Sequence, residues 1–257
     1  KKAKMNILNI EHVSKIFGDK KIFDDVSYGV QEGDKIGIVG LNGTGKTTML
    51  NIIAGVEEVD EGQIIMQNGI RLAYLSQNPY FPENATVLSY ALDGIDETDW
   101  TAQSEVKSAL NQLGITNHEQ RVSELSGGQK KRVFLARAIA QQGDVILLDE
   151  PFTGVDVKTE AKIISLLREL RAEGKTMLVS THNLGSVTTF CDYTVMVKGT
   201  VLASGPTDTT FTAENLELAF SGVLRHVTLN GSEESIITDD ERPFVAHRPS
   251  AVQREER

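Results

Sequence analysis

The sequence contains very little cysteine: Cys191 is its only one. A single cysteine cannot form a disulfide within the chain, so we expect a buried thiol in a reducing compartment. The chain also lacks an excess of positive charge, because 26 lysines and arginines stand against 36 aspartates and glutamates, for a formal net charge of -10. This balance argues against a general electrostatic affinity for nucleic acid or for an anionic membrane.

Long apolar runs and internal repeats are missing as well. The apolar run at 145–148 is typical of the longest ones, and it is far shorter than the roughly 20 residues that a membrane-spanning helix needs. The first residues, Lys-Lys-Ala-Lys, lead into a mixed polar and apolar segment, which is unlike a secretory signal peptide. No repeat with a period of about 20–50 residues is visible, which excludes a solenoid. What remains is a chain of 257 residues, 40% of them hydrophobic, enough for one α/β domain with a small subdomain.

Predicted strands and helices alternate along the chain, which indicates a mainly parallel sheet covered by helices. We expect strands within 5–30 (around a turn at Gly18), at 34–39, 145–149 and 175–180, and helices at 46–54, 128–141 and 157–173. Two β-branched runs in 62–75 flank Asn68 and Gly69, which predicts a hairpin. From 181 to Gly205 we expect strand-rich turns.

The composition predicts a division of the chain into parts. Prolines followed by helical periodicity predict a separate helical subdomain at about 79–124, within one domain at 5–229. The segment 230–257 is acidic and then polar with prolines, which predicts a flexible tail.

The segment Gly40-Leu-Asn-Gly-Thr-Gly-Lys-Thr47 fits the phosphate-binding pattern G-x-x-x-x-G-K-[ST] in full, between a predicted strand and a predicted helix. Its glycines let backbone N–H groups point at phosphate oxygens, and the positive end of the helix faces the same anion. The pattern predicts that Lys46 reaches the terminal phosphates and that the Thr47 hydroxyl binds Mg²⁺. The predicted nucleotide-binding residues of this loop are Gly40, Leu41, Asn42, Gly43, Thr44, Gly45, Lys46, Thr47 and Thr48.

Two acids end the predicted strand at 145–149. Ligands of parallel sheets bind beyond the carboxyl ends of the strands, so Asp149 and Glu150 should lie beside the phosphate loop. We expect Asp149 to be a Mg²⁺ ligand and Glu150 to orient or deprotonate the attacking water. Taken alone, the Asp-Glu pair would more often be an ordinary helix cap, but the phosphate loop earlier in the chain favours the catalytic interpretation.

The segment Leu125-Ser-Gly-Gly-Gln129, called here the signature segment, opens a predicted helix with Ser126 as a plausible N-cap. Together with the phosphate loop and the acid pair, it makes about residues 5–225 resemble the ATP-binding cassettes of the ABC family. The resemblance implies an α/β P-loop NTPase fold with a mainly parallel sheet core, an antiparallel β subdomain and an inserted helical subdomain. It also implies that ATP and Mg²⁺ are bound, and that the chain hydrolyses ATP.

The resemblance further assigns roles to single residues. Phe17 stands where an aromatic ring stacks on adenine, and Gln77 matches the glutamine that contacts Mg²⁺ and the attacking water. Thr47, Gln77 and Asp149 are thus the implied metal-site residues. His182 matches the histidine that senses the terminal phosphate, and with Glu150 and Gln77 it completes the implied catalytic set.

The implied arrangement is a dimer of two cassettes. Ser126, Gly127, Gly128 and Gln129 would cap the terminal phosphate held by the opposite chain. Asp156 matches the aspartate of the dimer-facing loop, where Ser-Ala-Leu-Asp is typical of the family and this chain reads Thr-Gly-Val-Asp. A monomer would then hydrolyse ATP poorly, and ATP would join the halves.

Within the ABC family, the leading hypothesis is an ATPase subunit that energises an importer, with manganese or iron cations as the expected substrates. Residues 125–257 resemble ATPase subunits of bacterial manganese and iron importers, whereas 5–124 resemble ABC-F cassettes, which act on ribosomes. An importer subunit would work at the inner face of the cell membrane with transmembrane permease subunits and an external binding protein. There are two alternatives. One is an ABC-F factor, for which nucleic acid would be a partner, and the other is an engineered chimera of an importer ATPase and an ABC-F cassette. The span between Thr48 and Leu125 has no room for the long coiled coil of a DNA-repair ATPase.

Overall fold

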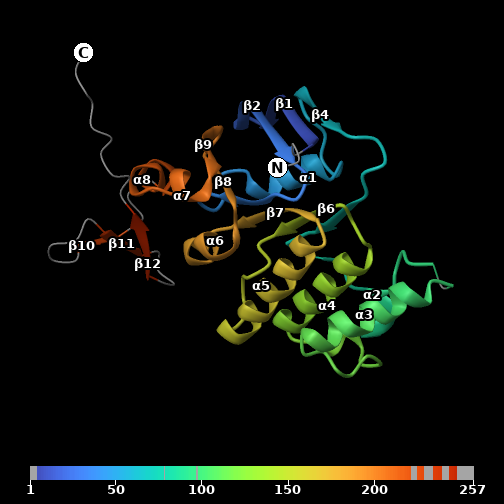
Figure 1. The fold of residues 1–257 in the computed structure, drawn as a ribbon. Coiled ribbons are helices and arrows are strands. Elements are labelled where there is room, and N and C mark those ends of the chain that lie inside the picture. The colour runs from blue at the N-terminus through green and yellow to red at the C-terminus, as the bar shows by residue number, and fades with distance from the viewer. Residues whose placement is uncertain are drawn as a thin grey trace, which may run out of the picture.

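A computed structural model describes residues 5–77, 79–96 and 98–220, together with the backbone of three strands near the C-terminus (Figure 1). Those strands are β10 (Arg225–Thr228), β11 (Glu234–Thr238) and β12 (Pro243–His247), which pair antiparallel in that order. The flexible tail predicted at 230–257 lies mostly outside the described residues.

A six-stranded sheet forms the centre of the fold, in the order β5-β6-β7-β3-β8-β9. Its strands are β3 (Lys35–Val39), β5 (Leu72–Leu75), β6 (Val145–Asp149), β7 (Thr176–Thr181), β8 (Tyr193–Val197) and β9 (Val201–Pro206). The first five in spatial order run parallel, and β9 pairs antiparallel with β8 at one edge. The predicted mainly parallel α/β sheet is therefore confirmed.

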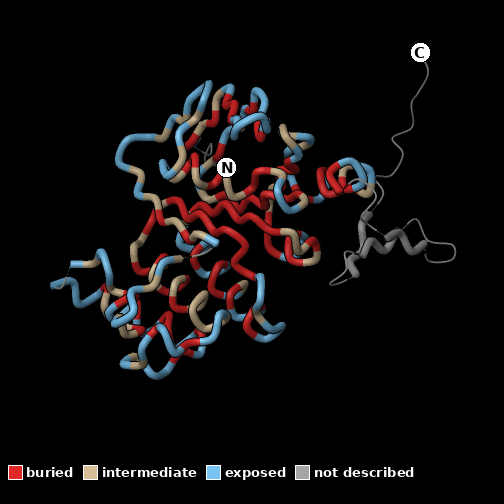
Figure 2. Tube along the Cα trace, turned by 180° about the vertical axis from the view of Figure 1, so that it is seen from behind, coloured by how far each residue is buried: buried red, intermediate tan, exposed pale blue. Residues whose placement is uncertain are grey.

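Both faces of this sheet are covered, and β6 shows why the sequence produces that arrangement. All five of its residues are buried, and successive side chains of a strand point to opposite faces. Val145 and Leu147 accordingly belong to one apolar core, and Ile146 and Leu148 to the other. The buried central strands contrast with the exposed periphery in Figure 2.

An antiparallel sheet and helix α1 (Lys46–Ile53) cover the first face. The antiparallel sheet has the order β2-β1-β4, from β1 (Asn6–Phe17), β2 (Lys20–Gln31) and β4 (Glu61–Met66). The hairpin predicted in 62–75 is wrong. The Asn68-Gly69 turn exists, with Gly69 at φ +86°, but it leads the chain from β4, which pairs with β1, to β5, which pairs with β6.

Helices cover the second face and form the helical region below the sheet in Figure 1. They include α2 (Val87–Ala91), α3 (Trp100–Gln112), α4 (Gly127–Ala140) and α5 (Val157–Ala172). Both α2 and α3 pack against α4, which begins beyond the boundary predicted at 124. The prediction of strand-rich turns from 181 to 205 missed one helix, α6 (Leu184–Phe190). Two further helices, α7 (Thr207–Thr210) and α8 (Ala213–Phe220), were not predicted either.

Candidate nucleotide site

The phosphate loop connects β3 to α1 at the carboxyl end of the central sheet. Its last residue, Gly45, has φ +106°, a backbone conformation that L side chains rarely adopt, and an added Cβ would lie 2.6 Å from the Phe23 ring. Only glycine fits there, which explains its place in the pattern. The Thr44 hydroxyl donates to the Leu41 carbonyl oxygen at 2.8 Å and closes the loop on itself.

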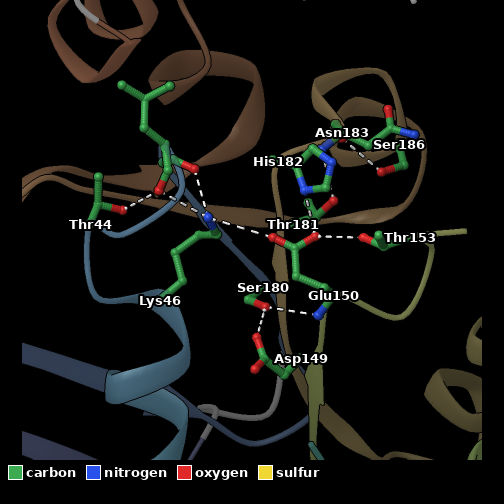
Figure 3. Close-up of polar contacts among 12 residues, drawn as sticks. Thr44, Lys46, Asp149, Glu150, Thr153, Ser180, Thr181, His182, Asn183 and Ser186 are labelled. Carbon is green, nitrogen blue, oxygen red and sulfur yellow. Dashed lines mark hydrogen bonds and ion pairs between the residues drawn. The ribbon is translucent and has the colours of Figure 1, made fainter. Parts of the chain in front are cut away.

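Lys46, the first residue of α1, is buried with its ammonium inside the loop (Figure 3). It donates to the carbonyl oxygens of Gly40 at 2.8 Å and Leu41 at 3.1 Å, and it lies 3.5 Å from Glu150 Oε1. Burial lowers the pKa of Lys46, and the charges of Glu150 and Asp149 oppose that effect. One buried cation thus joins the phosphate loop to the acid pair.

Glu150 is the meeting point of the site, and it is buried. Its Oε2 contacts His182 Nδ1 at 2.8 Å and accepts from the Thr153 hydroxyl at 3.2 Å, while Oε1 faces Lys46 (Figure 3). Burial alone would raise the pKa of this carboxyl, but His182, Lys46 and Thr153 together hold it below its ordinary value. The lowered pKa favours the ionised carboxylate, the form that a general base would need.

Asp149 lies one residue earlier, and Ser180 of β7 donates to its Oδ1 at 2.5 Å. Burial raises the pKa of Asp149, against hydrogen bonds from Ser180 and Thr47. Within the described residues, Oδ2 of Asp149 is buried and accepts no hydrogen bond. A buried oxygen in this condition beside a threonine hydroxyl fits Mg²⁺, which prefers oxygen ligands.

A cavity of about 320 Å³ joins these groups to the loop. It is lined by Lys20, Ile22, Asn42, Gly43, Gly45, Lys46, Thr47, Thr48, Gln77 and Glu150. The structure thus places Gln77 in the same cavity as the phosphate loop. Phe17 ends β1 opposite Lys20, which lines this cavity. The residue is 45% exposed, and the Lys15 ammonium lies over its ring, 5.0 Å from the centroid.

The signature segment begins α4. The Ser126 hydroxyl accepts from the Gln129 backbone N–H at 3.3 Å, and the Gln129 side chain accepts from the Ser126 N–H at 2.9 Å, a reciprocal capping box. Ser126 and Gly127 are exposed. Gly128 packs against the loop after β6, because a Cβ there would lie 3.3 Å from the Gly154 carbonyl oxygen.

Asp156 sits on that same loop and caps α5. Its side chain accepts from the backbone N–H groups of Lys158 and Thr159, both at 3.0 Å. The Thr159 hydroxyl also donates to this carboxylate at 2.8 Å, and this hydrogen bond, followed by those from the backbone, lowers the pKa of the carboxyl. The structure therefore shows that Asp156 caps the N-terminus of α5 within its own chain.

Three contributors to the site were missed from the sequence. Ser180 orders both acids, since it also accepts the Glu150 N–H at 2.9 Å. Thr153 hydrogen bonds to the Glu150 carboxylate, and Lys131 of α4 donates to the backbone of the same loop. A serine in the buried strand β7 could have indicated the first of these. The sequence marks Thr153 only as part of the dimer-facing loop, and no sequence spacing points to Lys131.

A glycine cradle with a buried lysine, facing two acids at the carboxyl end of a parallel sheet, defines a P-loop nucleoside triphosphatase. Comparison with known proteins narrows this class. A family profile described as "ABC transporter" matches residues 23–153. The chain is 43% identical over 250 residues to the chelated iron transport system membrane protein YfeB of Yersinia pestis, covering 86% of this chain and 84% of that protein.

Two further matches also point to an ATP-binding cassette. The manganese transport system ATP-binding protein MntA of Synechocystis is 42% identical over 228 residues, covering 82% of this chain and 87% of that protein. A solved dimeric cassette in a post-hydrolysis state, bound to ADP and phosphate, superposes with a TM-score of 0.69 at 26% identity, covering 78% of this chain and 98% of that one. The chain belongs to the ABC transporter ATP-binding family, and it is an ATP-binding, ATP-hydrolysing cassette.

Cassettes of this family dimerise and work with transmembrane permease subunits. None of the helices in the described part of this chain combines the length and apolar composition needed to span a bilayer.

Proposed function

We propose that this chain is the ATPase subunit of an importer for manganese or iron cations. The observation that carries the proposal is the pair of relatives above 40% identity, one named for chelated iron transport and one for manganese transport. Each match covers more than four fifths of this chain, so each extends well into residues 5–124. These matches favour the importer over an ABC-F factor, and they give no support to a chimera of two halves.

The proposed chemistry starts from the charges already in the site. Lys46 exchanges Glu150 for the β- and γ-phosphates of ATP, which releases the Glu150 carboxylate to orient and deprotonate a water. His182 holds that carboxylate by its contact with Oε2 and senses the terminal phosphate. Thr47, Asp149 and Gln77 would hold Mg²⁺, which supplies neutralisation of the phosphate charge when bound. Phe17 would stack on the adenine.

We further propose that each complete site is shared between two chains. The signature segment supports this, because the described structure exposes Ser126 and Gly127 at the positive end of a 14-residue helix, a favourable place for a phosphate. The similar solved cassette is a dimer with ADP and phosphate bound. Ser126 to Gln129 of one chain would then cap the nucleotide in its partner, and Asp156 would lie at the dimer contact.

The rest of the proposal concerns the membrane. A helical subdomain at about 79–124, linked to the site through Gln77, would pass closure of the dimer to permease subunits. The chain would lie at the inner face of the cell membrane, and an external binding protein would deliver the cation.

The first experiment measures association of the Glu150→Gln variant, which keeps the shape of the site but loses the base. With ATP and Mg²⁺ it should elute as a dimer in size exclusion, and with ADP as a monomer. A variant that stays monomeric in saturating ATP would contradict the shared site.

The second experiment separates the importer from the ABC-F alternative. The ATP-bound Glu150→Gln protein is used to capture partners from solubilised membranes and, separately, from ribosomes of the source cells. Capture of a permease, followed by ATP-dependent uptake of Mn²⁺ or Fe²⁺ in vesicles that contain it, is expected. Capture on ribosomes without any permease would overturn the importer proposal.

A further inference from the structure

Helix α4 carries more than the signature segment at its start. One turn further along, Lys131 turns its ammonium to the loop that follows β6. It donates to the carbonyl oxygen of Thr153 at 2.5 Å and to that of Glu150 at 3.3 Å. One side chain thus ties the helix that presents the signature to the backbone of the catalytic glutamate in the same chain.

The backbone that Lys131 holds is in an unfavourable conformation. Glu150 has φ +49°, in the left-handed region that residues other than glycine seldom adopt. Such a conformation persists only where neighbouring groups fix it. Here the Glu150 N–H donates to the Ser180 hydroxyl at 2.9 Å, and its carbonyl oxygen accepts from Lys131.

The same loop also sets the direction of the Glu150 side chain. The Thr153 hydroxyl donates to Glu150 Oε2, so moving Thr153 moves a hydrogen bond of the catalytic carboxylate. Lys131 holds the backbone at both Glu150 and Thr153, the two ends of this turn. The start of α4 touches the loop a second time, where Gly128 packs against Gly154.

We propose that Lys131 is a positioning residue that aims the Glu150 carboxylate and couples it to the signature segment of the same chain. The coupling rests on the proposed shared site. In that arrangement the signature of a chain caps one nucleotide, while its Glu150 acts on the other. A shift of α4 on capping the partner's ATP therefore passes through Lys131 to the glutamate of the second site, and hydrolysis at the two sites becomes cooperative.

The test compares Lys131→Met, Lys131→Arg and a control, Lys130→Met. Lys130 neighbours Lys131 on the same helix, but its ammonium lies over the Phe81 ring, 5.9 Å from the centroid. In Lys131→Met we expect kcat to fall about 10-fold or more, because misplacing a catalytic group by about 1 Å can cost up to about 100-fold. The KM for ATP should change little, and the Hill coefficient should fall towards 1.

Lys131→Arg can still donate to two carbonyl oxygens, so it should recover most of the rate and the Hill coefficient. Lys130→Met should match the wild type in both. A merely structural role would lower the unfolding temperature without separating kcat from KM or changing cooperativity. Wild-type kcat and Hill coefficient in folded Lys131→Met would overturn the inference.

A double variant, Lys131→Met with Glu150→Gln, distinguishes failure of the shared-site proposal from failure of the inference on Lys131. If this double variant still forms the ATP-dependent dimer while the single variant hydrolyses normally, the inference on Lys131 is wrong and the shared site stands. If Glu150→Gln alone never dimerises, the shared site is wrong, and with it the coupling.

Discussion

The buried charge pair beside the phosphate loop should oppose nucleotide binding in a measurable way. Lys46 and Glu150 lie 3.5 Å apart, and each side chain is 6% exposed. Replacing Glu150 with glutamine removes the charge that a phosphate must displace from Lys46, and also the charge that repels the phosphate. The variant should therefore bind nucleotide more tightly than the wild type.

The magnitude follows from the distance. At 3.5 Å and an effective dielectric constant of about 20, the two charges attract each other by about 5 kcal/mol. Much of this attraction is offset, because Lys46 keeps its two carbonyl acceptors and the nearby charge of Asp149. A net gain of about 1.4 kcal/mol or more, a tenfold lower Kd, is a conservative expectation.

The assay is calorimetric titration with ADP, which lacks the terminal phosphate that would join two chains and is not hydrolysed. Glu173→Gln, an exposed change at the end of α5, serves as the charge-matched control and should leave the Kd unchanged. Equal ADP affinity in the wild type and Glu150→Gln would refute the claim that the Lys46–Glu150 contact competes with phosphate.

Three further predictions follow from the same site. Lys46→Ala should lose most of its nucleotide affinity, because it removes the one ammonium inside the described loop; calorimetry that shows unchanged binding would contradict its role. The folded state lowers the pKa of Glu150, so its stabilising contribution is present above pH 4.5, its ordinary value, and is lost as the pH falls through the lower folded value. Without nucleotide, the free energy of unfolding of the wild type should thus exceed that of Glu150→Gln at neutral pH, and chemical unfolding should show the difference shrinking in acid; a pH-independent difference would count against an ionised Glu150. Gln77→Ala should leave ATP binding largely intact and weaken stimulation of hydrolysis by a permease, and equal stimulation would remove Gln77 from the coupling route.

The phosphate loop could be predicted from the sequence because its geometry is local, and the acid pair because the ends of parallel strands lie at one edge of the sheet. A glycine-rich turn between a strand and a helix has few possible shapes, and the acids at the end of β6 must meet it, since parallel strands share one carboxyl edge. The start of α4 could likewise be predicted, because Ser126 is a residue type that commonly caps a helix.

Features that depend on distant pairing could not be predicted in this way. The Asn68-Gly69 turn has the same local signal whether its strands pair with each other or, as here, with β1 and β6. Helix α6 has small and β-branched residues, among them Gly185 and Ser186, that obscure helical periodicity. Lys131 and Thr153 meet only because α4 packs beside the loop after β6, and no spacing in the sequence reveals that contact.

The central claim is that one nucleotide is held by Lys46 of one chain and capped by Ser126 of another. A crystal structure of Glu150→Gln with ATP and Mg²⁺ tests it most directly. We predict a dimer in which each terminal phosphate contacts Lys46 on one side and the signature segment of the partner chain on the other. A bound ATP whose terminal phosphate lies out of hydrogen-bond reach of any partner Ser126 would contradict the account.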